Sequence, residues 1–242
     1  LLVENFDRPP YVENTYNPPF YEALLTSFGF GKAKDLLTWM IDIREGMSTP
    51  KRKRIQKIAN RVREREGITV RPVDLKDADA EIARMYDLYV KAWEKNWGFV
   101  PLERAEFLFM MGDLKMVAID ELVLFVEVDG APVGFCATLP NVNEKMPKNG
   151  RLFPFNWLKM LNLKKTTSGR LITLGMLPEY RKRGLETIMF TETLLAGQRQ
   201  GWERGEIGWT LDDNDLVNRA IESMEGWLDR RYRILGLRLG EG

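Results

Sequence analysis

The chain has 242 residues, of which 44% are apolar and 29% charged, a composition typical of a globular protein with a buried core. Lysine and arginine total 36 and aspartate and glutamate total 35, so the formal charge of +1 gives no overall attraction for nucleic acid or an anionic membrane. There is no histidine and one cysteine, Cys136, which excludes histidine-based triads, zinc sites of histidine or several cysteines, and intrachain disulfides. We therefore expect no metal site, and a cytoplasmic protein that does not associate with membranes, because no apolar run is long enough to cross a bilayer.

Two segments, one near each end of the chain, predict the same pair of elements. Residues 17–30 and 214–227 each begin with an asparagine and reach a glycine after 29 − 17 = 12 and 226 − 214 = 12 residues. Each pattern predicts a short helix that starts from an Asn cap, stops at the glycine and leads into a strand, over 32–43 and 230–239. Helix, glycine and strand is a common local pattern, so spacing alone leaves repetition and coincidence equally open.

Next along the chain, residues 50–66 predict a helix with apolar side chains at helical spacing and the basic run 51–54. Such a run favours a solvated helix face over nucleic-acid binding. The later apolar segments predict strands over 68–73, 122–128, 133–139, 170–176 and 206–211, helices over 82–93, 102–111 and 184–200, and a long loop over 141–169. Asp129-Gly130 between two of these strands is a strong hairpin signal. Strands with interposed helices predict α/β layers around one sheet.

Residues 174–189 predict a strand, a sharp basic turn and a helix, a combination suited to a phosphate group. The unpaired N–H groups at the start of a helix point the same way, and the helix dipole adds positive charge there. Arg181, Lys182 and Arg183 add full charges, and Gly184 lets the backbone approach a ligand without a Cβ in the way.

In this context the segment Leu-x-Pro-x-Tyr-Arg-x-Arg-Gly resembles the GNAT superfamily of acyl-CoA N-acyltransferases, and the resemblance extends from about Ile68 to the C-terminus. It implies a GNAT-like fold, a mixed, mostly antiparallel sheet flanked by helices, and a coenzyme A site. The residues that it assigns to acetyl-CoA or coenzyme A are Leu174, Gly175, Met176, Arg181, Lys182, Arg183, Gly184, Leu185, Glu186 and Asn214. In the family a backbone N–H in the splayed strand before the turn polarises the thioester carbonyl, and Met176 lies in the matching stretch.

The sequence departs from the family pattern at two places. Glu186 replaces a Gly or Ala of the family's turn, where its carboxylate would either repel a diphosphate or, as a partner of the helix dipole, point to solvent. The helix after the fifth strand lacks the tyrosine that many members use to protonate the leaving thiolate, and Tyr232 is a possible substitute, although packing is the more common role of a strand tyrosine. Glu206 is a candidate general base, together with Asp212 and Asp213.

The resemblance also predicts an acceptor pocket and a domain organisation. It assigns the acceptor pocket to Trp93, Asn96, Trp97, Phe153 and Phe155, for which core or lid packing is an equal alternative. Residues 1–43 resemble the end of a preceding GNAT-like unit, 44–67 form a linker helix, and 68–242 form the acyltransferase domain. A bacterial group of GNAT-like proteins with a longer amino-terminal part shows the same organisation, and a homodimer is compatible with it.

We therefore expect an N-acyltransferase that moves an acyl group, in the simplest case acetyl, from coenzyme A to a small-molecule or peptide amine by direct attack in a ternary complex. Cys136 lies mid-strand, which predicts a buried apolar residue and no covalent intermediate. The alternative from another class is a non-catalytic binding module that has lost the donor site. A nucleic-acid binder that uses residues 51–57 is a third possibility.

Overall fold

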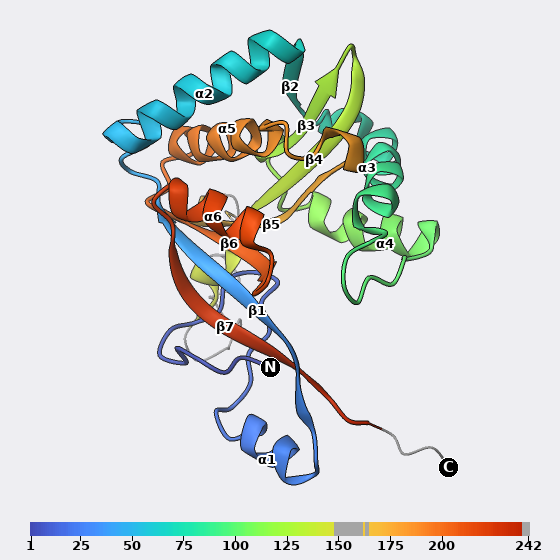
Figure 1. The fold of residues 1–242 in the computed structure, drawn as a ribbon, viewed down its shortest axis with the longest axis vertical. Helices are drawn as coiled ribbons and strands as arrows, with labels where there is room; N and C mark the ends of the chain where they lie inside the picture. Colours follow the sequence, from blue (N-terminus) through green and yellow to red (C-terminus); the bar gives the residue numbers. More distant parts are fainter. Residues whose placement is uncertain (148–161, 163–164, 239–242) are drawn as a thin grey trace.

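The computed structural model describes residues 1–147, 162 and 165–238, and in this part of the chain seven strands form one sheet (Figure 1). The order across the sheet is β2-β3-β4-β5-β6-β1-β7, and every neighbouring pair is antiparallel except β5 and β6. The strands are β1 (Gly31–Asp42), β2 (Ile68–Pro72), β3 (Val123–Val128), β4 (Ala131–Pro140), β5 (Ser168–Met176), β6 (Arg204–Leu211) and β7 (Trp227–Gly236). The mixed, mostly antiparallel sheet that the sequence predicts is confirmed.

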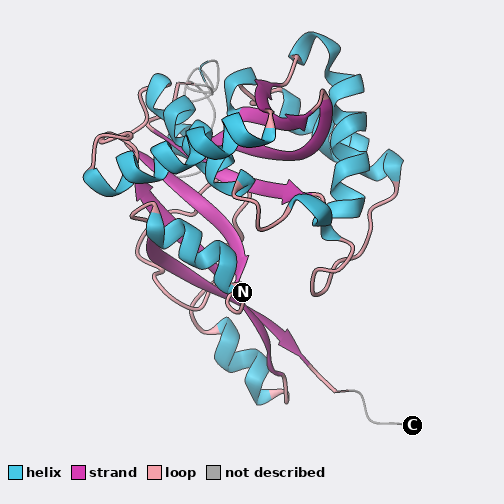
Figure 2. Cartoon of the chain, turned by 45° about the horizontal axis from the view of Figure 1, so that its top comes forward, coloured by secondary structure: helices cyan, strands magenta, loops and turns pink. Residues whose placement is uncertain are grey.

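Helices cover both faces of this sheet. They are α1 (Tyr21–Ser27), α2 (Pro50–Glu66), α3 (Ala78–Trp93), α4 (Arg104–Lys115), α5 (Leu185–Arg199) and α6 (Asp215–Ser223), and short 3₁₀ helices span Leu75–Asp77, Asp120–Leu122, Val142–Lys145 and Pro178–Tyr180. Side chains that alternate along a strand enter opposite cores: Leu124 and Val126 pack with α5, α2 and α6, whereas Val123 and Phe125 pack with α3 and α4. α1 lies apart, at the far end of the β1–β7 pair (Figure 2).

The hairpin between β3 and β4 forms as predicted, with adjacent antiparallel strands. Asp129 and Gly130 at its turn have φ values of 51° and 76°, the left-handed conformation that a two-residue hairpin turn requires. The hairpin belongs to the antiparallel part of the sheet, which ends at β5.

β5 and β6 separate part-way along their length. Their parallel pairing runs from Ser168 with Arg204 to Leu171 with Ile207, and the described strands have no further paired positions beyond this point. The backbone of β5 after Leu171 therefore has no ladder partner on the β6 side, while its other edge stays paired with β4 up to Met176. The two strands thus splay apart beyond Leu171 and Ile207.

The first strand of the chain completes the sheet. β1 lies between β6 and β7, so residues from the N-terminal segment separate the last two strands (Figure 1). The proposed repeat offset of 214 − 17 = 197 makes Asp35 equivalent to Tyr232 (35 + 197 = 232) and Leu36 equivalent to Arg233 (36 + 197 = 233). In the β1–β7 ladder Leu36 pairs with Tyr232 and Asp35 pairs with Arg233, so each residue pairs with the equivalent of its neighbour. The two copies thus meet in an antiparallel ladder about an approximate two-fold axis. The assignment of residues 1–43 to a preceding unit remains a prediction.

Two local expectations need correction. Asn17 does not cap α1, which begins four residues later at Tyr21, because its side chain instead accepts the backbone N–H of Leu2 at 2.7 Å. Within the basic run at the start of α2, Arg52 is not solvated: it is 2% exposed and donates hydrogen bonds to the carbonyl oxygens of Met224, Asp42 and Gly46 at 2.8–3.1 Å. Arg52 therefore links the start of α2 to the end of β1 and to the residue that follows α6.

None of the helices in the described ranges combines the length and the apolar character that a membrane span requires.

Candidate functional site

The gap between the separating strands is a cavity of about 180 Å³. Its walls come from β5, β6, α5, the start of α6, and the end of α3 with the turn that follows it. The lining residues are Trp93, Asn96, Leu171, Ile172, Thr173, Leu174, Phe190, Ile207, Gly208, Trp209, Thr210, Leu211, Asn214 and Val217. We refer to it as the splay cavity. Trp93 reaches it by lying over Gly175, where a Cβ would stand 2.0 Å from the indole ring. A glycine at this position of β5 is therefore a requirement of packing.

The basic turn before α5 has the features of an anion cradle. Among the described residues, the backbone N–H groups of positions 182–186 have no acceptor. Gly184 has φ = 88° and precedes the first helical residue without a side-chain cap, which leaves the helix N-terminus open. These features fit the diphosphate of an acyl-CoA, because consecutive free amides and the helix dipole bind anions.

The charged side chains of the turn divide into two roles. Arg181 donates to the carbonyl oxygen of Met176 at 3.2 Å and to that of Ala92, so its guanidinium braces the turn. Arg183 pairs with Glu66 at the end of α2. Lys182 is exposed and has no ion-pair partner in the described chain. Of the three cations that the sequence proposes, Lys182 is the one free to approach a phosphate.

A second, much larger cavity lies on the other side of β5, beneath α3 and α4. It has a volume of about 690 Å³, within the range of small-molecule sites. Its lining is mainly apolar and includes Val73, Leu75, Ala78, Ile82, Met85, Tyr89, Phe107, Met110, Met111, Leu114, Ala118, Val123, Phe135, Ala137, Leu139 and Ile172. Its polar lining consists of Glu13, Glu81, Lys115, Arg170 and Thr173. We refer to it as the apolar cavity.

The two cavities share one boundary. Ile172, Thr173 and Trp209 line both of them, so the splay cavity and the apolar cavity are adjacent at the point where β5 leaves β6. Arg170 flanks this boundary, with its guanidinium carbon 5.1 Å from the centroid of the Trp209 ring. A reactive carbonyl at the end of one cavity would therefore meet a group that projects from the other.

A buried polar network that includes Arg170 lies next to this boundary. Arg170 and Glu206 are 2% and 1% exposed and form an ion pair at 3.0 Å across β5 and β6. Asn14 donates to the same Glu206 oxygen at 2.6 Å. Burial raises the pKa of Glu206 to about 7, against the opposing effect of the Arg170 charge. Glu206 lines neither the splay cavity nor the apolar cavity.

The structure brings together two of the candidate catalytic residues. Tyr232, 2% exposed on β7, packs edge-on against Trp209 with ring centroids 5.4 Å apart. Burial raises the pKa of its hydroxyl, and the nearby Glu206 carboxylate acts in the same direction. The hydroxyl has no hydrogen-bond partner among the described groups. Tyr232 and Glu206 thus lie near each other, although 26 positions separate them in sequence (232 − 206 = 26).

The other predicted site residues occupy several places. Asn214 caps α6, accepting the N–H of Val217 at 3.4 Å, and Asn96 lines the splay cavity. Met176 is buried at the end of β5. Trp97 is 48% exposed, with the Lys34 ammonium 5.7 Å from its ring centroid. Phe153 and Phe155 lie outside the described residues, and Asp212 and Asp213 pair with Lys32 and Lys34 at the surface.

Sequence analysis missed Glu13, Arg170 and Trp209. Arg170 carries a signal in retrospect, because a cation at the first position of an apolar strand in a central sheet needs a buried partner. Glu13 carries no signal, since its contact with the site depends on how the N-terminal segment crosses the sheet.

Comparison with known proteins places this geometry in a fold family. No family model matches the chain. It is similar to protein YghO of Escherichia coli (strain K12), with 30% identity over 243 aligned positions, and to a bacterial ceramide synthase of Caulobacter vibrioides (strain NA1000 / CB15N), with 31% identity over 242. Each alignment covers 97% of this chain, which spans 61% and 62% of the two relatives.

Solved structures decide the fold. The chain superposes on a GCN5-related N-acetyltransferase from Sphaerobacter thermophilus with a TM-score of 0.58 and 15% identity, over 88% of this chain and 54% of that one. It superposes on a tandem GNAT protein from the clavulanic acid biosynthesis pathway with a TM-score of 0.54 and 10% identity, over 93% and 60%. The chain has the GNAT fold. The resemblance noted in the sequence assigns the coenzyme A arm to the splayed strands of this fold and the diphosphate to the open turn before α5.

Proposed function

We propose that the chain is an acyl-CoA-dependent N-acyltransferase whose acceptor is an amine on a long alkyl chain. The observation that carries this proposal is the shared boundary of the splay cavity and the apolar cavity at Ile172, Thr173 and Trp209. A small cavity beside β5, the strand that leads into the anion cradle, suits a coenzyme A arm, and a large apolar cavity that meets it suits a hydrocarbon chain.

When bound, acyl-CoA supplies an activated acyl group as its thioester. The residues of this chain would bind and orient it. The free amides of positions 182–186 and Lys182 hold the diphosphate, and the unpaired edge of β5 after Leu171 offers backbone groups to the arm. Orientation of amine and thioester at one boundary is itself a large catalytic contribution.

The acceptor class follows from the lining of the apolar cavity and from one relative. Buried hydrocarbon is favourable by about 0.8 kcal/mol per CH₂, so an apolar cavity of about 690 Å³ selects long chains. Similarity to a bacterial ceramide synthase supports this choice, because a ceramide is the N-acyl derivative of a long-chain amino alcohol. The resemblance implies acetyl as the acyl group, which is the smallest donor group to be tested. It also implies a small-molecule or peptide amine as the acceptor, and the long-chain amine is to be compared with that class.

The test uses the full chain, coenzyme A and two amines of equal headgroup, decylamine and ethylamine. We expect coenzyme A to raise the melting temperature, since a ligand at 100 times its dissociation constant stabilises a protein by about 2.7 kcal/mol. With acyl-CoA donors from acetyl to palmitoyl, mass spectrometry should detect the amide of decylamine and much less of ethylamine. A melting temperature unchanged by any acyl-CoA, with no amide formed, would favour the non-catalytic binding module.

A further inference from the structure

Most of the charged groups that line the apolar cavity are paired with other side chains. Glu81 is 3% exposed and pairs with Arg71 at 2.7 Å and with Arg84. Lys115 has the Asp79 carboxylate at 3.9 Å. These groups balance one another and close the walls of the cavity.

Arg170 is committed as well. Its guanidinium donates to the carbonyl oxygens of Val12 at 2.7 Å and Gly208 at 3.1 Å, and its Nε lies 3.0 Å from Glu206. The polar groups of the lining that remain without a hydrogen bond or ion pair among the described residues are the Tyr89 hydroxyl, the Thr173 hydroxyl, the Trp209 indole N–H and the Glu13 carboxylate. Of these four groups, Glu13 is the charged one.

Glu13 belongs to an N-terminal segment that is clamped on both of its sides. The N–H of Val12 donates to the Asn141 side chain at 3.2 Å, the Val12 carbonyl accepts from Arg170, and the Asn14 side chain donates to Glu206. Val12 is also buried in the core beneath α3 and α4. The segment therefore holds Glu13 in one place beside the boundary.

The backbone at Glu13 has φ = 60°, the left-handed region that a non-glycine residue adopts at a cost. Fixed contacts at Val12 and Asn14 impose this conformation, and a glycine at position 13 would adopt it without strain. The position thus carries a glutamate although glycine would suit its backbone conformation better.

We propose that Glu13 binds the ammonium group of the long-chain acceptor and takes a proton from it. This inference rests on the proposed function and names the residue that reads the acceptor's headgroup. The ammonium gives one proton to the Glu13 carboxylate, and the amine then attacks the thioester carbonyl carbon. As the C–N bond forms and the C–S bond breaks, the second proton lost from nitrogen goes to the departing sulfur.

The placement of charges favours Glu13 over Glu206 for this role. Glu206 already forms an ion pair with Arg170 and accepts a hydrogen bond from Asn14. Arg170 lines the apolar cavity and separates Glu206 from it. Glu13 is exposed at the cavity edge and lies close enough to Arg170 for its charge to raise the pKa of that guanidinium, opposing the effect of burial. Because Arg170 is already paired with Glu206, an amine acceptor would supply the cation that pairs directly with Glu13.

The first experiment compares decylamine with decanol by calorimetry, below their critical micelle concentrations. We expect the full chain to bind the amine about tenfold more tightly, the difference that one charge-assisted hydrogen bond provides. Glu13→Gln should remove this preference, and Asp7→Asn on the same segment, whose side chain is outside the cavity, should retain it. Equal binding of amine and alcohol, or a preference that survives Glu13→Gln, would overturn the proposal.

Two further measurements of melting temperature distinguish this role of Glu13 from a structural role and from a role in coenzyme A binding. Glu13→Gly should raise the melting temperature by about 2–4 °C through relief of strain, while still losing amine selectivity; a lower melting temperature would show that the side chain serves the fold. Stabilisation by coenzyme A should be unchanged in both Glu13 variants. If coenzyme A stabilises no variant while amine selectivity depends on Glu13, the proposed function fails and the ammonium site stands.

Discussion

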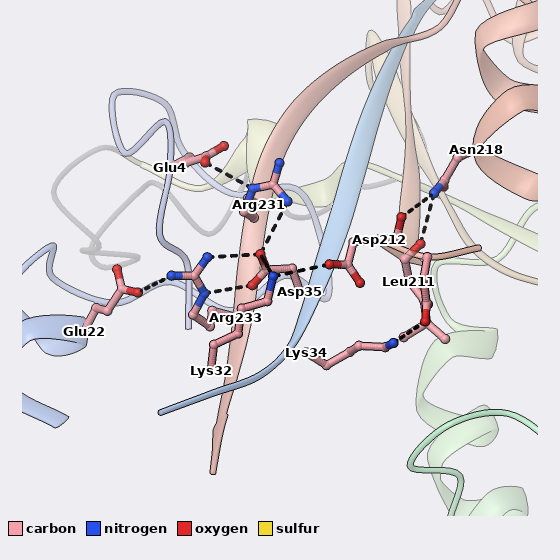
Figure 3. Close-up of polar contacts among 11 residues, drawn as sticks. Glu4, Glu22, Lys32, Lys34, Asp35, Leu211, Asp212, Asn218, Arg231 and Arg233 are labelled. Carbon is pink, nitrogen blue, oxygen red and sulfur yellow. Dashed lines mark hydrogen bonds and ion pairs between the residues drawn. The ribbon is translucent and has the colours of Figure 1, made fainter. Parts of the chain in front are cut away.

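Asp35 and Arg233 face each other at the centre of the β1–β7 ladder and join through two hydrogen bonds. Arg233 donates from Nε to one carboxylate oxygen at 2.8 Å and from Nη2 to the other at 3.0 Å (Figure 3). Arg231 and Lys32 add contacts at 3.4 and 2.8 Å, and Asp35 is 1% exposed. Because β1 lies between β6 and β7, this cluster fixes an N-terminal strand to the last strand of the chain.

Loss of this carboxylate should destabilise the chain. Asp35→Asn leaves Arg233 with a neutral partner, and we expect a loss of about 3 kcal/mol in the free energy of unfolding, as for other buried pairs broken on one side. Urea unfolding at pH 7 measures it. Glu4→Gln, which removes the exposed partner of Arg231, is the control and should cost less than about 1 kcal/mol. The cations lower the pKa of Asp35 below its usual range, so its contribution should be complete above pH 5 and decline as the pH falls.

Glu206 should have the opposite effect of pH on stability. Its pKa is raised by burial to about 7, compared with about 4.3 in an unfolded chain, so the folded protein holds the extra proton between these values. Its contribution to stability should therefore decrease as the pH rises from about 4.3 to about 7. The difference between wild type and Glu206→Gln, measured by urea unfolding from pH 5 to 8, isolates Glu206; a difference independent of pH contradicts the prediction.

The donor turn can be tested by charge and by backbone conformation separately. Gly184→Asp should abolish the rise in melting temperature with coenzyme A, since it adds a negative charge to the anion cradle; its Cβ would lie 3.3 Å from a methyl group of Val62 in α2. Gly184→Ala carries the same φ of 88° without the charge; it should cost about 1 kcal/mol in stability and retain binding in part. If both variants bind coenzyme A as well as the wild type, the turn is ordinary surface.

The orientation of the Glu186 carboxylate determines whether it weakens coenzyme A binding at this turn. Glu186→Gly should enlarge the coenzyme A-dependent shift if the carboxylate faces the ligand, and leave it unchanged if the side chain points to solvent from the first turn of α5. Thermal melting over a range of coenzyme A concentrations distinguishes these outcomes.

Turnover should not depend on Cys136. Its side chain is fully buried on β4, and burial raises the pKa of its thiol to about 11, so no thiolate is available for acyl transfer. Cys136→Ala should keep the catalytic rate within about twofold, with a small loss of stability from the removed sulfur. A folded Cys136→Ala variant without activity would refute direct transfer.

Filling the apolar cavity should shorten the alkyl chain that the protein binds. Ala137 lines this cavity from β4, and Ala137→Leu places three additional carbon atoms inside it. We expect weaker binding of decylamine, by about fourfold for each CH₂ group that is displaced, and unchanged stabilisation by coenzyme A. Ala131→Leu, at an exposed position of the same strand, is the control. Equal losses for amines of all lengths would place the alkyl chain elsewhere.

Much of the fold follows from local sequence signals. The helix over residues 50–66 was predicted with its observed ends, because Thr49 and Pro50 start it and Gly67, with φ = 61°, stops it. The β3–β4 hairpin follows from Asp129-Gly130 in the same way. The turn at Gly184 could also be located, since a helix N-terminus after a strand is a property of adjacent residues.

Only the tertiary structure shows what these elements enclose. β1 pairs with residues 162–175 positions away on β6 and 187–205 positions away on β7, and no local pattern specifies such partners. The apolar cavity exists because α3 and α4 stand away from the sheet, a matter of packing volume and not of periodicity. Glu13 reaches its edge because Arg170 and Glu206, from two other strands, hold the segment on either side of it. The position of this carboxylate is the sum of long-range contacts, and these form only when the whole sheet is assembled.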